Sequence, residues 1–218
     1  VVNDYNGTSD ASDVYPLGTT TVTWTVTDGS GNTSSCSMNV TVTDIEAPGI
    51  TCAADVAVNT DSGVCEAQVS MASPSTSDNC SVASVVNDYN GTSDASDVYP
   101  LGTTTVTWTV TDGSGNTSSC SMNVTVTDVE LPIIDCPLDI VLSECTPTAS
   151  WSLFATDNCG VSSISTDIPS GSTFVEGTTT IITVTAIDNS GNVANCTFSV
   201  TRDPDLLLVA VANQIGRA

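Results

Sequence analysis

The sequence predicts an all-β protein made of tandem antiparallel β-sandwich modules, and three observations support this prediction. First, Thr, Ser, Val, Asp and Asn dominate the 218 residues, while residues that favour helices are scarce. Second, residues 1–44 are identical to residues 85–128, so the chain repeats with the length of one small domain. Third, apolar and polar residues alternate with a period of two in each copy, as in strands that bury one face.

The alternation also locates the strands. Val106, Trp108 and Val110 alternate with threonines, and a second alternating segment follows the turn Asp112–Asn116, so the two segments form a hairpin. Three shorter segments lie upstream between turn residues, as a sandwich requires. The expected strands cover residues 56–58, 65–71, 82–86, 105–111 and 121–127.

The repeat sets the expected domain boundaries. A divergent third copy aligns Gly177 with Gly102 and Asp188 with Asp112, with one extra residue between these landmarks, for which we expect a β-bulge. Because residue 1 lies inside the recurring pattern, we expect more of the first module upstream. The expected segments are the C-terminal part of a truncated module at 1–44, a complete module at 45–128, a divergent module at 129–203, and a tail or the start of a further domain at 204–218.

Four motifs of the second copy resemble the hyalin repeat (HYR) family. They are Pro48-x-Ile50-x-Cys52, Asp78-Asn79-Cys80, Tyr99-Pro100-Leu101-Gly102-Thr103-Thr104, and Asp112–Asn116 followed by Cys120. The third copy repeats them, with Val175 where proline is usual. The resemblance implies immunoglobulin-like sandwiches in a secreted or cell-surface adhesion protein, without enzymatic activity.

The charge distribution excludes several kinds of chemistry. The sequence has no His and no Lys, and only Arg202 and Arg217 oppose 25 acidic residues, for a net charge of −23. A catalytic imidazole, a Schiff-base amine and a basic groove for nucleic acid are therefore absent from the sequence. The longest apolar run, Leu206–Ala212, is too short to cross a bilayer. We expect neither an enzyme nor a protein that binds nucleic acid or inserts into membranes, and no cofactor is required.

Nine cysteines without a Cys-x-x-Cys pair indicate disulfides, and therefore an oxidising, extracellular compartment. In an immunoglobulin-like sandwich the first strand can lie parallel to the last, which favours a bond between the first and fourth cysteines of a module. The spacing of the second and third cysteines is nearly constant, which favours their pairing. The expected bonds are Cys52–Cys120, Cys65–Cys80, Cys136–Cys196 and Cys145–Cys159, with Cys36 bonded to an upstream residue.

Acidic and amide residues gather at the expected module junctions and in the loops that would face them. Hard oxygen ligands of this kind can hold Ca²⁺. The alternative is that Asp and Asn serve as turn residues and that the acidic charge maintains solubility. The candidate ligands are Asp44, Glu46, Asp78, Asn79, Asp112, Asn116, Asp128 and Glu130.

Sequons for N-glycosylation recur through the chain, although a sequence rich in Ser, Thr and Asn also produces them by chance. They are centred on Asn6, Asn32, Asn39, Asn79, Asn90, Asn116, Asn123 and Asn195. Trp24, Trp108 and Trp151 lie on alternating strands, where core positions are favoured over a sugar-binding platform.

The leading functional prediction is a non-catalytic stalk or spacer of a cell-surface adhesin or filament, whose partners are further repeats or identical subunits. One alternative is a self-assembling filament subunit that adds its Leu206–Ala218 tail to a neighbour's sheet. Another is a module that binds a surface glycan or protein through the outward Thr/Ser/Asn faces of its strands or through its repeated loops.

Overall fold

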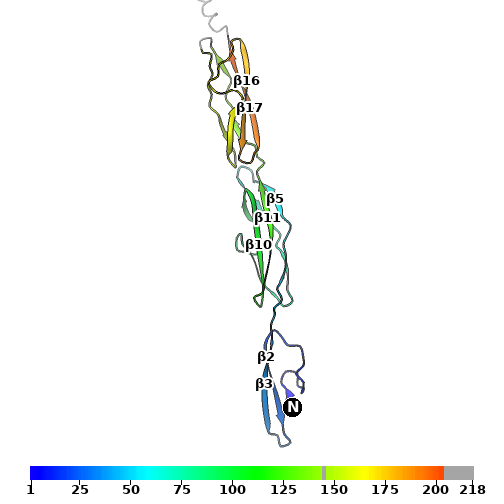
Figure 1. Cartoon of the computed structure of the whole chain (residues 1–218). Coiled ribbons are helices and arrows are strands. Elements are labelled where there is room, and N and C mark those ends of the chain that lie inside the picture. The colour runs from blue at the N-terminus through cyan, green and yellow to red at the C-terminus, as the bar shows by residue number, and fades with distance from the viewer. Residues whose placement is uncertain (144–145, 204–218) are drawn as a thin grey trace, which may run out of the picture. The chain divides into compact units, whose positions relative to one another are not determined.

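The computed structural model describes residues 1–143 and 146–203, in which every regular element is a β-strand. The chain forms two compact units: residues 1–54, 71–95 and 106–122, and residues 55–70, 96–105 and 123–218. The middle repeat contributes to both units, because its long strands β10 (Gly102–Asp112) and β11 (Thr117–Thr127), labelled in Figure 1, each have residues in both. The all-β prediction is confirmed.

The first repeat forms the three-stranded sheet β1-β2-β3. Strands β2 and β3 pair antiparallel without interruption from Gly18 with Val42 to Thr27 with Thr33. Threonine and serine side chains on one face pair across the strands, as between Thr23 Oγ1 and Ser37 Oγ at 3.0 Å. The bounds are β1 Val2–Asn3, β2 Gly18–Thr27 and β3 Thr33–Val42.

The second repeat contains a four-stranded sheet of order β5-β11-β10-β8 and two short antiparallel pairs, β4 with β7 and β6 with β9. The predicted hairpin corresponds to β10 and β11. The bounds are β4 Gly49–Thr51, β5 Val56–Asn59, β6 Glu66–Val69, β7 Ser75–Ser77, β8 Val82–Asn87, β9 Asp97–Pro100, β10 Gly102–Asp112 and β11 Thr117–Thr127.

The third repeat has the same plan, with a four-stranded sheet β13-β17-β16-β15 and the antiparallel pair β12-β14. Its bounds are β12 Ile133–Asp135, β13 Ile140–Leu142, β14 Phe154–Thr156, β15 Val161–Thr166, β16 Thr178–Asp188 and β17 Val193–Arg202.

The extra residue of the third repeat does not produce the expected bulge. Strands β16 and β17 pair in continuous register from Thr178 with Arg202 to Ile187 with Val193. The additional residue is accommodated before this ladder begins, since Gly177 precedes β16 while its counterpart Gly102 is the first residue of β10. The register shift in β15, between Val161 and Ser163, is unrelated to this residue, because β8 and β10 of the second repeat have an equivalent shift.

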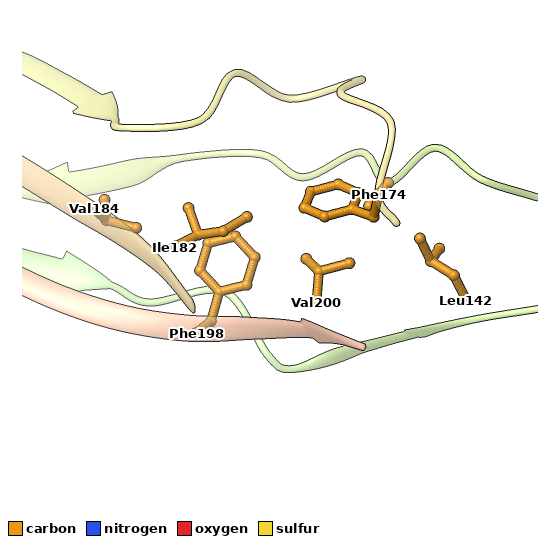
Figure 2. Close-up of a cluster of buried hydrophobic side chains, with 7 residues drawn as sticks. Leu142, Phe174, Ile182, Val184, Phe198 and Val200 are labelled. Atoms are coloured by element: carbon orange, nitrogen blue, oxygen red, sulfur yellow. The ribbon is translucent and has the colours of Figure 1, made fainter. Parts of the chain in front are cut away.

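The core of the third repeat shows how alternation builds the sandwich. Ile182 and Val184 of β16 and Phe198 and Val200 of β17 are buried and point into one cluster (Figure 2). Ile134 of β12 packs against this cluster, so the second sheet covers the first. This two-layered packing confirms the sandwich prediction.

The three tryptophans differ in burial. Trp108 is 1% exposed and is a core residue, as predicted. Trp151 is half-buried and packs edge-on against Phe198, with ring centroids 5.2 Å apart. Trp24 is also only half-buried, although its local sequence is identical to that of Trp108. The described residues include no helix of the length and hydropathy needed to cross a membrane.

Candidate functional site

Each complete repeat has one internal disulfide between its first and last strands. Cys52 bonds Cys120 with a Cα separation of 5.7 Å, and Cys136 bonds Cys196 at 6.2 Å, which are the pairings that the sequence predicted. The register explains both bonds. In the parallel pair β5-β11, Val56 lies opposite Val124, and each cysteine precedes its strand residue by the same number of positions. Strands β13 and β17 repeat this arrangement.

The third disulfide corrects the sequence prediction. Cys65 bonds Cys159 of the following repeat, so neither Cys65–Cys80 nor Cys145–Cys159 forms. Cys65 and Cys80 belong to different compact units, because the chain runs along β6 and then β7 between them. Their constant spacing therefore reflects two fixed positions and not a bond. Cys145 lies outside the described residues.

Cys36 and Cys80 are exposed free thiols in the described structure. The proposed upstream partner of Cys36 stays a prediction. Cys80 occupies the position that corresponds to Cys159, in the motif Asp-Asn-Cys. Desolvation raises the pKa of the Cys80 thiol, and the negative charge of Asp44 adds to this effect, so the thiol is protonated at neutral pH.

Hydrogen bonds surround the inter-repeat disulfide. The side-chain amide of Asn158 donates to the carbonyl of Val64 at 3.0 Å, one residue before Cys65. The backbone amide of Gly63 donates to the carboxylate of Glu130 at 3.1 Å. The loop before β6 is thus attached to the next repeat by a covalent bond and by two polar contacts made by the residues just before Cys65.

Two groups of three aspartates lie where one repeat meets the next. Asp44, Asp78 and Asp112 form the first group and Asp128, Asp157 and Asp188 form the second, and in each group one carboxylate oxygen per residue lies within 4.8 Å of the others. Each group belongs to a single compact unit. The members occupy matching places: after the last strand of one repeat, after the short strand β7 or β14, and at the end of β10 or β16.

The third aspartate of each group is fixed by its own turn. Asp112 Oδ1 accepts hydrogen bonds from the backbone amides of Ser114 and Asn116, and its Oδ2 accepts one from Asn116 Nδ2 at 2.7 Å. Burial alone would raise the pKa of Asp112, but these hydrogen bonds outweigh it and hold the pKa below its ordinary value. Asp188 has equivalent bonds and the same pKa direction.

The other two aspartates of each group use only one oxygen. Asp128 Oδ1 accepts from the backbone amide of Glu130, and Asp157 Oδ1 accepts from that of Cys159. Their Oδ2 atoms are buried and have no hydrogen-bond partner among the described residues. In the first group, Asp44 Oδ2 and Asp78 Oδ1 are buried and unpartnered in the same way.

The predicted calcium ligands are thus only partly brought together. Asp44, Asp78 and Asp112 meet, but the carboxylates of Glu46 and Glu130 instead accept hydrogen bonds from Asn79 Nδ2 and from a backbone amide. Asn116 donates to Asp112 and to the carbonyl of Asp44, which occupies its amide nitrogen. Asp157 and Asp188 were not among the predicted ligands, although alignment of the third copy with the second identifies both.

The sequon asparagines differ in how free their amide nitrogens are. Asn32 and Asn116 use Nδ2 to bind the aspartate of their own turn, and Asn79 uses it to bind Glu46. Asn39 and Asn195 are exposed and accept threonine hydroxyls through Oδ1. The remaining sequons are at Asn6, Asn90 and Asn123, which are half-buried.

Comparison with known proteins follows this repeat structure. The HYR domain family matches residues 3–42, 43–126 and 127–202. Hyalin of Strongylocentrotus purpuratus is 35% identical over 213 residues, which cover 89% of this chain and 17% of that protein. Hyalin of Lytechinus variegatus is 30% identical over 205 residues, or 88% of this chain and 38% of that protein.

A rat protein, "Sushi, von Willebrand factor type A, EGF and pentraxin domain-containing protein 1", is 35% identical over 159 residues, or 70% of this chain and 4% of that protein. Among solved structures, Drosophila N-cadherin EC1-4 is similar with a TM-score of 0.37 and 13% identity, covering 87% of this chain and 59% of that one. The chain spans well under half the length of each of these curated relatives. By its three matching segments, the chain belongs to the HYR domain family.

Proposed function

We propose that this chain is a non-catalytic spacer in a secreted or cell-surface protein, where it serves as part of the stalk of an adhesin or filament. The observation that carries this proposal is the Cys65–Cys159 bond, because it joins successive repeats at a point separate from the main-chain linker. A second covalent link restricts bending at the linker, which is a useful property for a spacer and unnecessary for independent domains.

The composition and the relatives support the proposal. Disulfides persist in oxidising, extracellular compartments. The sequence contains no His and no Lys to act as a base or an amine nucleophile. In the rat relative, whose name includes four other kinds of domain, the matching region is 4% of the protein. A small repeat region among other domains is consistent with a spacing role.

Negative-stain electron microscopy of the purified, oxidised chain tests the proposal, with and without residues 205–218. These residues lie outside the described structure. They include the Leu206–Ala218 tail, which in the filament alternative adds to a neighbouring subunit's sheet. Separate single particles, unchanged by the deletion, are the expected result. Ordered filaments that disappear on deletion would show an assembling subunit and would overturn the spacer proposal.

A further inference from the structure

We propose that the two aspartate groups are calcium sites, one at each junction between repeats, formed by Asp44, Asp78 and Asp112 and by Asp128, Asp157 and Asp188. The proposal concerns the ion alone and holds whether or not the chain is a spacer. It begins from the buried oxygen atoms that no donor among the described residues satisfies.

Asp128 provides the strongest observation. Its side chain is 3% exposed, its Oδ1 accepts a backbone amide, and its Oδ2 is buried without a partner among the described residues. A buried carboxylate oxygen requires compensation by a hydrogen-bond donor or a cation. Asp157 Oδ2 is equally buried and unpartnered, and both residues belong to the group whose oxygens lie within 4.8 Å of one another.

The first junction reproduces this arrangement with different residues. Asp44 is 8% exposed and its Oδ2 is buried and unpartnered, as is Oδ1 of Asp78. The third repeat has diverged from the second over most of its length, yet it keeps the counterparts of Asp78 and Asp112, and the unsatisfied oxygens recur. Chance turn residues would not explain unsatisfied oxygens in matching places at both junctions.

The chemistry of the grouped ligand atoms indicates that the ion is calcium. Every grouped ligand is a carboxylate oxygen, which favours a hard cation over zinc or copper. Two oxygens that bind one calcium ion lie no more than about 5 Å apart, given metal–oxygen distances of about 2.3–2.6 Å. The grouped oxygens lie within 4.8 Å of one another and are therefore close enough to share one ion. In the described residues, Arg202 is the only basic side chain, and it instead pairs with Glu176.

A cation in either site would connect consecutive repeats. Asp128 follows β11 of the second repeat, whereas Asp157 follows β14 and Asp188 ends β16 of the third. The bound ion would therefore add a third link at a junction that already has the main chain and the Cys65–Cys159 bond.

NMR titration of the ¹⁵N-labelled, oxidised chain with CaCl₂ tests the proposal, because backbone amides report on each site separately. We expect saturable shifts at the amides of Ser114 and Asn116, which donate to Asp112, and at those of Ser190 and Asn192, which donate to Asp188. Dissociation constants should be on the order of 10⁻⁴–10⁻³ M, as in other extracellular modules.

Variants separate the sites. Asp128→Asn keeps an acceptor for Glu130 but should remove the saturable shifts of Ser190 and Asn192 and leave those of the first junction intact. Asp44→Asn should have the opposite effect. The unaffected junction in each variant also shows that the chain remains folded.

Asp28 provides a matched control. It makes the same turn bonds to Ser30 and Asn32 as Asp112 makes to its own turn, but it is exposed and belongs to neither group. Amide shifts at this turn should be small and should not saturate. If the Asp28 turn responds as strongly as the junctions, or if the junction shifts survive in the Asp44→Asn and Asp128→Asn variants, the calcium sites do not exist as proposed.

Discussion

Peptide mapping can test the inter-repeat disulfide directly, because aspartates lie between all of the cysteines in the sequence. A protease that cleaves before aspartate places each of the nine cysteines on a different peptide, with Cys65 on 61–77, Cys80 on 78–87 and Cys159 on 157–166. Mass spectrometry of the unreduced digest should therefore find peptide 61–77 joined to 157–166. Finding 61–77 joined to 78–87 would refute the bond and restore the pairing expected from spacing.

The stability that this bond contributes can be estimated from the loop it closes. Cys65 and Cys159 are 94 residues apart, but the other two disulfides already shorten the path between them. With those bonds in place the loop is roughly 50 residues, for which the chain-entropy relation gives about 4 kcal/mol. The Cys65→Ser/Cys159→Ser variant should lose up to this amount, measured from guanidinium unfolding monitored by tryptophan fluorescence.

Cys36→Ser provides the control, because this exposed thiol is unbonded and its replacement should leave the unfolding midpoint unchanged. If the double variant unfolds at the same denaturant concentration as the parent chain, the bond does not constrain the unfolded state as the estimate assumes.

The same reasoning extends to Cys80. A chain in which residues 45–128 are duplicated in tandem creates a new junction, Asp128 followed by Ile45, whose local sequence matches that of Asp44 and Ile45. Cys65 of the first copy should then bond Cys80 of the second, since Cys80 occupies the position of Cys159. Digestion before aspartate would again show peptide 61–77 joined to 78–87, now between the two copies. Isotope labelling of one copy, introduced by segmental ligation, distinguishes this bond from a bond within one copy.

Three further predictions follow from burial and hydrogen bonding. Trp108→Ala should cost about 3–5 kcal/mol in unfolding free energy and Trp24→Ala clearly less, because identical sequences bury these rings differently. The lowered pKa of Asp188 contributes stability that is present above its unfolded value, about 3.9, and is lost as pH falls through the folded value. Asp188→Asn should therefore reduce the dependence of the melting temperature on pH below about pH 4. In a eukaryotic secretory host, glycopeptide mapping should find Asn195 modified and Asn116 unmodified, because Asn116 Nδ2 is bound to Asp112.

The sequence predicted those features that depend on local pattern. Alternation located the hairpin β10 and β11, and the idea of a first strand parallel to the last gave Cys52–Cys120. The prediction from sequence was wrong where the disulfide partner of a cysteine lies in another repeat. Constant spacing between Cys65 and Cys80 was interpreted as a bond, because spacing alone carries no information on which end of a module each residue occupies.

The aspartate groups show the same limit. Asp44 and Asp112 are 68 positions apart and could be related only by assuming how one repeat meets the next. Glu46 and Glu130 were predicted as ligands because they lie two residues after Asp44 and Asp128 at the expected junctions. A glutamate two residues along an extended chain is displaced from its neighbour, and both carboxylates found backbone or amide donors instead.

Two covalent attachments join the second and third repeats at the junction after β11, and their positions determine the motion that the junction permits. Asp128 continues the main chain from β11, while Cys65 bonds Cys159 through a loop that follows β5. Asn158 lies between them, donating to Val64 and lying 3.5 Å from Asp128 Oδ1. Two covalent attachments at separate points oppose any bending that changes the distance between them, so the remaining freedom is rotation about the line that joins them. The second aspartate group combines Asp128 of one repeat with Asp157 and Asp188 of the next, so a bound cation would add a third attachment at this junction.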